Sequence, residues 1–600
     1  MPPDEDEFLR CYLEELSYLR RMGERFAHDH PKIARRLELQ GDECPDPHVE
    51  RLIESFAFLT ARIQRDLDQD FPEIATELLD ILYPSYLNPI PPLTIVRFDV
   101  QPKITKPVTV RRDTPLFVHT TESDVCRFRT CYPLTLWPIE VVEAKFVEAS
   151  EYKFPRQSRH AAAVLRVTLN SLSEPFEKLG VDTLRFHLQG DMVANRLLSL
   201  LLDGERRRVA VVASGKHAIP DLPCLEVSHV GFGEDDSVIH TSPQSHPAYR
   251  LLQEYFAFEE KFHFVDVSGL RGRAEGQKID LLFLLDREPR GRVLLTPESF
   301  VLGCTPAINL YETTGEPIRI DQRRTKYRLV ADHRRERTVD IHSVLAVSGS
   351  SDATQTEREY APFYSYTHAM ARTEQTAFWH ARRESPDIFL SFYDSDFQSA
   401  FPADEIVFAR LLCSNGALAP EIAAGKHLET DEVLPLRGIV NLRKPTQPLA
   451  PHLGGESLWR LVSHLSLNYL TLEGKEVEKE AAALREILLL YCNPDARAQR
   501  QRIEGIKSVS SKKVICRLPD SSWSGFTRGT RVTVTLAESL FASGDDFLLS
   551  SVLSHFLALQ ASINSFTQLV VRRDGDDRLA AAAEPKGRPW PVMAGGRAVL

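Results

Sequence analysis

The sequence lacks any apolar run of the roughly 20 residues that a membrane-spanning helix requires. Its longest apolar segments, Leu281–Leu285 and Leu197–Leu202, have the length expected inside a protein core. The first residues, Met1–Glu7, are acidic, whereas a secretory signal begins with basic residues followed by an apolar stretch. We therefore expect a soluble, cytoplasmic protein that does not insert directly into a membrane.

Cysteine is sparse, and its spacing matches no metal or disulfide framework. The nine cysteines form an odd number without a repeated interval, which favours a reduced compartment over a disulfide-stapled fold. Neither Cys44 with His48 nor Cys126 with Cys131 has the Cys-x-x-Cys spacing of a zinc ribbon. The metalloprotease sequence His-Glu-x-x-His is absent. We expect no metal site and no cofactor.

Motifs for nucleotide binding and nucleophilic catalysis are also missing. The sequence Gly-x-x-x-x-Gly-Lys-Ser/Thr does not occur, and Gly231 and Gly233 lack a third glycine and precede acidic residues, which favours a turn. There is no Gly-x-Ser-x-Gly turn. Ser463 and His464 are neighbours, about 100° apart on a helix, and cannot face each other as nucleophile and base. His464 and His555 lie among apolar residues and are interpreted as packed side chains. No catalytic residue is predicted.

Excess positive charge is absent too. The formal net charge of −11 argues against a general nucleic-acid binder, which usually has a basic excess. The best basic cluster surrounds Tyr327 and consists of Arg319, Arg323, Arg324, Lys326 and Arg328. We interpret it as a solvated face or as a contact surface for an acidic protein, and we expect no nucleic-acid partner.

What the sequence does contain is an N-terminal region of amphipathic helices. Asp46 suits the N-cap position of a helix and Pro47 the first helical position, where its missing N–H costs nothing. Leu52, Phe56 and Leu59 then recur at helical spacing. Such a helix is stable only if its apolar face is buried against something.

Two more helices flank this one in the predicted arrangement. The preceding helix shows a near-heptad pattern formed by Leu9, Tyr12, Leu16 and Leu19. A following helix is predicted with Pro72 in its first turn and an end before Pro84. The pattern favours a helical bundle or a helical assembly surface and names no function.

From Leu93 the hydrophobic period changes to that of short strands, interrupted by helices near 194–202 and 249–256. Among the predicted strands are Lys278–Leu285 and, in the C-terminal region, Lys512–Leu518. Turn-rich segments at Gly349–Gln355 and Asn441–Gly455 are predicted linkers, and further helices are expected at Ser457–Leu467, Glu476–Tyr491 and Asp546–Ile563. The predicted fold class is α+β multidomain, with an N-terminal amphipathic helical region (1–92), a β-rich central body (93–350), a second mixed β domain with linker (351–450) and a mixed α/β C-terminal domain with an extended tail (451–600).

Six blocks of sequence occur in order and span nearly the whole chain. They are Tyr12–Gly23 with His30–Ala34; Glu43–Leu52 running to Leu82–Leu87; Tyr249–Phe258 with Lys261 and Phe262; Gly303–Pro306 with Asn309 and Leu310; Trp459–Tyr469; and Ala561–Phe566 with Trp590 and Pro591. Together these blocks resemble the TssF (VasA/ImpG) family of the bacterial type VI secretion system. Ala248 and Glu259 depart from the glycine and proline expected around the third block.

The resemblance implies a function in assembly. TssF-like proteins are baseplate wedge subunits that assemble with TssG, TssK, TssE and a second copy of TssF. Through the baseplate they ring the VgrG hub beneath the membrane complex, at the inner face of the cytoplasmic membrane. The ring templates polymerisation of the Hcp tube and sheath.

On this basis, a bundle shared with a partner is expected to use the face formed by Leu9, Tyr12, Leu16, Leu19, Leu52, Phe56 and Leu59. Burial of the same face within the chain's own fold is the alternative. Two other functions also stay open. One is a wedge protein of a contractile phage-like particle, and the other is a cytoplasmic enzyme whose site is built from residues distant in sequence, which leaves no motif.

Overall fold

The structure is a computed structural model of the 600-residue chain. It forms two compact units, Met1–Tyr83 with His452–Leu467, and Pro84–Pro451 with Asn468–Leu600. The described residues are 12–13, 15–19, 22, 47–120, 124–154, 161–190, 193–202, 208–219, 225–241, 245–286, 288–289, 293–320, 324–351, 357–363, 377–384, 387–394, 405–451, 461, 477–493, 496–517, 526–541, 544–574 and 587–595.

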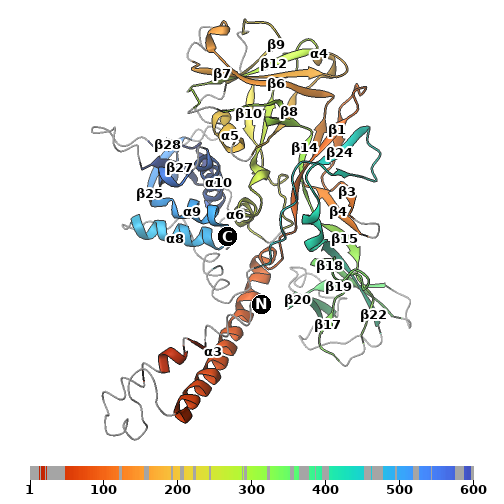
Figure 1. Cartoon of the computed structure of the whole chain (residues 1–600), viewed down its shortest axis with the longest axis vertical. Coiled ribbons are helices and arrows are strands. Elements are labelled where there is room, and N and C mark those ends of the chain that lie inside the picture. The colour runs from red at the N-terminus through yellow and green to blue at the C-terminus, as the bar shows by residue number, and fades with distance from the viewer. Residues whose placement is uncertain are drawn as a thin grey trace. The chain divides into compact units, whose positions relative to one another are not determined.

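The principal element of the first unit is helix α3, Pro47–Leu82 (Figure 1). It begins at Pro47 and ends before Pro84 as predicted, and Asp46 lies outside the described residues. The predicted start of a separate helix near Pro72 is wrong, because α3 continues through this residue. An internal proline costs about 3 kcal/mol. Apolar residues on both sides nevertheless share a face: Phe56 and Leu78 are 22 positions apart, about 40° around the axis.

The larger unit is built mainly from antiparallel sheets. Strand β1 is central to the first, pairing with β14 on one edge and β24 on the other, so segments far apart in the chain meet there. In spatial order this sheet contains β23 (His427–Leu428), β24 (Leu436–Asn441), β1 (Leu93–Val100), β14 (Cys304–Ile308), β4 (Val125–Thr130) and β3 (Pro115–His119).

Within the described residues, two four-stranded sheets and a short two-stranded ribbon complete the central body. One sheet is β10 (Glu226–His229), β11 (Phe264–Ser268), β8 (Thr183–Leu188) and β13 (Phe300–Leu302). The other is β6 (Ile139–Val147), β7 (Ala163–Ser171), β12 (Lys278–Leu285) and β9 (Arg208–Ala213), and the ribbon is β2 (Val108–Val110) with β5 (Leu134–Leu136). The helices here are α4 (Phe176–Leu179), α5 (Ala194–Leu202) and α6 (Pro247–Ala257), with 3₁₀ turns η1 (Pro84–Tyr86), η2 (Ala149–Glu151), η4 (Glu259–Phe262), η5 (Pro297–Ser299) and η7 (Gly416–Glu421).

A further sheet is inserted between β14 and β23. It contains β15 (Tyr311–Thr314), β22 (Glu405–Ser414), β18 (Asp340–Ser351), β19 (Glu357–Pro362), β20 (Ala377–Glu384), β21 (Asp387–Asp394) and β17 (Tyr327–Arg328), with β16 (Ile318–Arg319) also on β22. Tyr311 pairs with Cys413, so the chain enters and leaves this sheet side by side. The predicted loop from Gly349 is wrong in its first residues, because β18 reaches Ser351.

Two buried asparagines clamp the entrance and exit of the inserted sheet. The backbone N–H of Asn415 donates to Asn309 Oδ1 at 2.6 Å, and Asn309 Nδ2 donates to Asn415 Oδ1 at 3.0 Å. Asn415 Oδ1 also accepts from the N–H of Arg127 at 2.9 Å, which ties the clamp to β4. Because such buried amides are costly to leave unpaired, the clamp fixes where the inserted sheet joins the central body.

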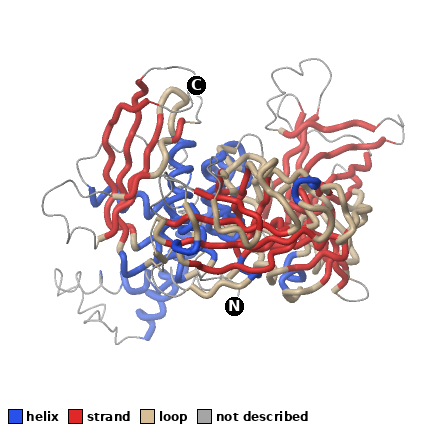
Figure 2. The backbone as a smooth tube through the Cα atoms, turned by 90° about the horizontal axis from the view of Figure 1, so that it is seen from above, coloured by secondary structure: helices blue, strands red, loops and turns tan. Residues whose placement is uncertain are grey.

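The C-terminal part of the larger unit is a mixed sheet covered by helices (Figure 2). The long hairpin β25 (Ile506–Arg517) and β26 (Phe526–Leu536) is continued by the parallel strand β27 (Phe566–Arg573), on which β28 (Arg588–Pro589) and β29 (Met593–Ala594) lie. Helix α8 (Val477–Leu489) contacts β25, and helix α10 (Asp545–Gln560), which is almost entirely buried, contacts β27, α5 and α6. The remaining helical elements are α9 (Arg497–Glu504) and η9 (Glu538–Leu540).

The segment from α6 to η4 is a polar junction that we call the 254–261 junction. Lys261 is fully buried, and its Nζ lies 2.5 Å from Glu254 Oε2 and donates to the carbonyl of Asp236 at 3.0 Å. Glu254 Oε1 accepts from the backbone N–H of Val238 at 2.7 Å and of Ile239 at 3.1 Å. This ion pair therefore ties α6 to the loop that precedes it. Burial lowers the pKa of Lys261, and the Glu254 carboxylate opposes that effect.

Glu259 in the same junction connects the central body to the C-terminal part. Arg502 of α9 binds Glu259 Oε2 at 2.7 Å and Asp545 Oδ2 at 3.0 Å, while Asn195 of α5 donates to both carboxylates. Burial alone would raise the pKa of Glu259, but the Arg502 charge lowers it overall. Gly544 allows α10 to begin here, since a Cβ at its φ of +103° would lie 2.7 Å from the Asn195 carbonyl oxygen.

The sequence-based fold class is confirmed: the chain is helical at its N-terminus and rich in strands thereafter. Helix α5 and strand β12 have the predicted limits. Helix α10 begins one residue before its predicted start and ends at Gln560, so the predicted end at Ile563 is wrong. Of the predicted helix Ser457–Leu467, only the buried Leu461 is described. The domain limits at 92, 350 and 450 remain predictions.

Replacing Arg502 with methionine should lower the free energy of unfolding by about 3 kcal/mol, because two largely buried carboxylates then face each other without their shared cation. Arg497→Met, an exposed arginine on the same helix, is the matched control and should change it by less than about 0.5 kcal/mol. Chemical denaturation of both variants measures the difference. Equal stability would contradict a structural role for the Glu259–Arg502–Asp545 contacts.

Stability should fall as the pH is lowered from 6.5 towards 4. Burial lowers the pKa of His187 and His342 to about 3 and that of His263 to about 4, so these side chains are neutral in the folded protein. The unfolded chain binds a proton on each below about 6.5, and each therefore costs about 2 kcal/mol by pH 5. Thermal melting against pH measures this.

The histidine assignment is tested by comparing His187→Gln with His427→Gln, in which the replaced side chain is exposed. The first should flatten the pH dependence of the melting temperature, and the second should leave it as it is. A dependence unchanged by His187→Gln would contradict the assignment.

Candidate functional site: an exposed apolar face of helix α3

Helix α3 has two apolar faces, and only one of them is buried. Ala57 and Ala61 are fully buried on one side of the helix. Leu52, Phe56 and Leu59 lie on the opposite side and are 60%, 63% and 54% exposed. At about 100° per residue, these three side chains fall within one stripe whose centre is roughly 150° around the axis from the two alanines. The chain itself thus leaves the predicted face largely in water.

Exposed apolar side chains also occur near the end of the helix. Leu78, Ile81 and Leu82 are 37%, 43% and 48% exposed. Leu79 and Tyr83, by contrast, are fully buried, so this end of α3 also has one apolar side covered and another open. Groups of exposed large apolar side chains are typical of a protein interaction surface, whereas single ones need no explanation.

The described residues of the preceding segment, 12–13, 15–19 and 22, are helical. Leu16 is buried, Tyr12 and Leu19 are half-buried, and Leu9 lies outside the described residues. The predicted face is therefore divided, because Leu16 is covered within the chain whereas Leu52, Phe56 and Leu59 are open.

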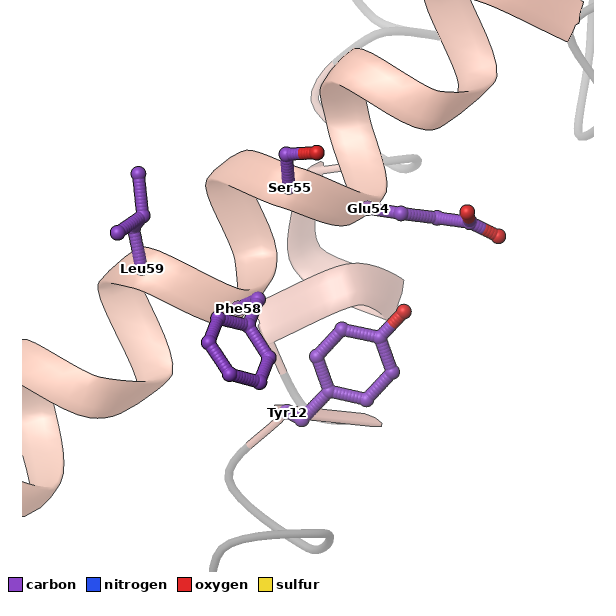
Figure 3. A pocket seen from close by; sticks show the side chains of 5 residues that line it. All are labelled: Tyr12, Glu54, Ser55, Phe58 and Leu59. Carbon is purple, nitrogen blue, oxygen red and sulfur yellow. The ribbon is translucent and has the colours of Figure 1, made fainter.

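A groove of about 330 Å³ lies between this segment and α3, lined by Tyr12, Glu54, Ser55, Phe58 and Leu59 (Figure 3). The Tyr12 and Phe58 rings lie beside each other, and Leu59 points away from them. Phe58 is 49% exposed and about 200° around the helix from Phe56. The sequence prediction missed it because that prediction followed a single apolar stripe. The adjacent apolar residues Phe56, Phe58 and Leu59 were the signal that two faces are apolar.

The glycines considered for nucleotide binding form a turn, as the sequence predicts. Gly231 has a φ of +112°, and Asp236 Oδ2 accepts from the backbone N–H of Gly231 at 3.0 Å and of Gly233 at 3.3 Å. His555, interpreted as a packed residue, stacks on Phe232 with ring centroids 3.7 Å apart. The acidic residue that follows the glycines thus fills the position that a phosphate would need.

Other candidate chemistry has structural explanations within the described ranges. Cys126 and Cys131 are free and buried, and burial raises the pKa of each thiol to about 12. No group of three or more His, Cys, Asp or Glu side chains there could hold a metal ion. Lys326 pairs with Glu384, and Arg328 pairs with Glu336 and Asp387, so these members of the basic cluster lie in ion pairs. His464 and Arg323 lie outside the described residues.

Among the helices of the described residues, none is long and apolar enough to cross a bilayer.

Comparison with known proteins gives one consistent family. The family model described as type VI secretion system, TssF, matches residues 4–593. The type VI secretion system component TssF1 of Pseudomonas aeruginosa is 34% identical over 618 aligned positions, which cover 97% of this chain and 99% of the relative.

Solved structures agree with this result. A chain in the cryo-electron microscopy structure of the type VI secretion system TssK–TssF–TssG baseplate subcomplex superposes with a TM-score of 0.71 at 26% identity, covering 90% of this chain and 98% of that one. A chain in the baseplate complex of the type VI secretion system shares the fold, with a TM-score of 0.60 at 22% identity and coverage of 99% and 100%.

The resemblance inferred from the six sequence blocks is confirmed by the match along nearly the entire length. The chain belongs to the TssF family of the type VI secretion system.

Proposed function

We propose that this chain is a structural wedge subunit of the type VI secretion baseplate, working in the cytoplasm at the inner face of the cytoplasmic membrane. Its family membership and its likeness to a chain of the TssK–TssF–TssG subcomplex support this role. The observation that carries the proposal is the exposed apolar stripe of α3, because a fold complete in itself would have covered it.

The exposed stripe is large enough to matter energetically. Burying a leucine or phenylalanine side chain fully is worth about 1.5–3 kcal/mol. Leu52, Phe56 and Leu59 would therefore supply several kcal/mol if a partner covered them. With 36 residues, α3 is about 54 Å long. A helix of that length offers a continuous surface to another helix.

The partner proposed for this stripe is TssG, through one or more of its helices packed along α3. Leu52, Phe56 and Leu59 supply the open part of the contact, and Tyr12 and Leu19, both half-buried, can add to it. Leu16 is buried within the chain, where it stabilises the chain's own helices, and it contributes less to the contact with TssG. Such a shared bundle buries on assembly what the separate chain leaves in water.

The remaining partners are proposed from family membership. TssK is expected beside TssG, and TssE, a second copy of TssF, the VgrG hub and the membrane complex are expected through the assembled baseplate. The role is structural and not catalytic: the ring of wedges would template the Hcp tube and sheath. The family match favours secretion over a contractile phage-like particle.

The pair Leu52→Asp and Phe56→Asp should abolish co-purification with a co-expressed TssG from the same organism, since two carboxylates would have to be buried in the contact. Both side chains are exposed in this chain, so its own melting temperature should change little. Pull-down and size-exclusion chromatography measure binding. Arg51→Asp with Arg62→Asp, exposed positions on the same helix, is the matched control and should retain TssG. Undiminished binding by the apolar-face variant would sink the proposal.

In a strain lacking this protein, secretion of the Hcp tube protein should be lost and should return when the wild-type chain is supplied. The Leu52→Asp, Phe56→Asp variant should fail to restore it although the protein accumulates to a normal level. Immunoblots of culture supernatant and of cells measure both quantities. Restoration by this variant would show that the stripe is dispensable for assembly.

A further inference from the structure

The hairpin β25–β26 carries a second exposed surface that the contact with TssG does not use. Directly opposed residues on antiparallel strands share a face, and Ile515 is opposite Arg528. Near its base this face is buried through Val509, Val532 and Val534. Farther along it emerges into solvent, where Ile515 is 62% and Phe526 82% exposed. We call this outer part the hairpin face.

The hairpin is strongly basic within an acidic protein. Strands β25 and β26 contain six Lys and Arg residues and no Asp or Glu. Since the whole chain has a formal charge of −11, the remainder carries −17 once these six cations are set aside. Lys513 and Arg528 flank the exposed apolar side chains of the hairpin face. No ion pair of the described residues joins Arg528 to a carboxylate. The hairpin face therefore suits an apolar contact surrounded by negative charge.

A surface of that chemistry exists on the same chain, in the loop between β23 and β24. Val433 is 102% exposed, and Glu429 and Asp431 beside it are exposed acids. Strand β3 holds this loop in place. Glu429 exchanges backbone hydrogen bonds with Phe117 at 2.8 and 2.9 Å, and Thr430 Oγ1 donates to the carbonyl of Pro115 at 2.7 Å. An apolar side chain held out by a fixed loop loses little entropy on binding. We call it the 429–433 loop.

We propose that the 429–433 loop of one copy of this chain docks on the hairpin face of a second copy. Val433 packs against Ile515 and Phe526, and the acids of the loop face Lys513 and Arg528. The hairpin and the loop belong to different sheets, and they are complementary in both polarity and charge. Opposed charges of this kind speed association and fix the orientation of the partner.

The geometry of such a contact has a consequence for assembly. Two different patches are joined, so the contact is head-to-tail, and each bound copy still offers a free hairpin and a free loop. Contacts of this type close into rings or continue as filaments. The proposal extends the wedge function to contacts between copies, and it uses no residue of α3. It can therefore fail while the TssG contact stands, and the reverse.

Sedimentation velocity of the purified full-length chain tests the proposal. Self-association should rise with protein concentration at about 50 mM salt and weaken at about 500 mM, because the contact is partly electrostatic. Lys513→Glu with Arg528→Glu should weaken it at least about tenfold, as should Glu429→Lys with Asp431→Lys. Mixing these two variants should restore association, because each reversed patch then meets a patch of opposite charge.

The matched control reverses two charges on the other face of the same hairpin, Lys512→Glu with Arg531→Glu, and should change association less than about twofold. Melting temperatures confirm that each variant is folded. A wild-type chain that stays monomeric at both salt concentrations would overturn the proposal, as would a control that weakens association equally or a mixture that fails to recover it. Hairpin-dependent binding of a single-stranded DNA oligonucleotide without self-association would overturn it in favour of a nucleic-acid surface.

Discussion

The 254–261 junction is the constraint on which the larger unit depends. Within eight residues it places four charged side chains, and each one or pair reaches a different part of the chain. Glu254 and Lys261 hold the loop before α6, Glu259 holds α5 and α9, and Glu260 pairs with Arg443 at 2.5 Å in the segment after β24. Arg502 and Asn195 in turn bind Asp545 of α10. Buried charges cost free energy unless they are paired. These three sets of contacts therefore position together the parts of the larger unit that they connect.

The same logic explains why the junction lies in one of the sequence blocks that identify the family. Tyr249–Phe258 with Lys261 and Phe262 has the amphipathic pattern of a short surface helix, and nothing in one sequence marks Glu254 and Lys261 as buried. Charged residues are almost never fully buried unless they are paired. The pairing depends on residues between Asp236 and Arg443 that only the tertiary fold brings together, so sequence reasoning gave the helix and not its purpose.

Elements with a nearly continuous apolar sequence were predictable. Strand β12 is apolar at nearly every position from Ile279 to Leu285, and α5 is leucine-rich, so burial alone sets their limits. Strand β25 begins six residues before its predicted start. The prediction missed its first half because Ser508, Ser510 and Ser511 do not suggest a strand.

The prediction of a helix break at Pro72 was wrong for a different reason. A proline is a strong local signal for the end of a helix, yet a 36-residue helix with a shared apolar side can tolerate one lost hydrogen bond.

For the candidate site, the helical periodicity identified Leu52, Phe56 and Leu59. The spacing of these residues does not indicate whether the surface that covers them belongs to this chain or to another.

The asparagine clamp has a consequence for how the protein can change. Asn309 and Asn415 hold the two ends of the inserted sheet against one another, so the chain enters and leaves this sheet at one place. Beside the clamp, Leu412 of β22 packs into the same core cluster as Leu93 and Ile95 of β1. Such a module can lengthen, diverge or be exchanged for another without disturbing strand β14 or the turn after Asn415. The fold thus separates the frame that carries the clamp from an inserted sheet whose outer surface can change independently of that frame.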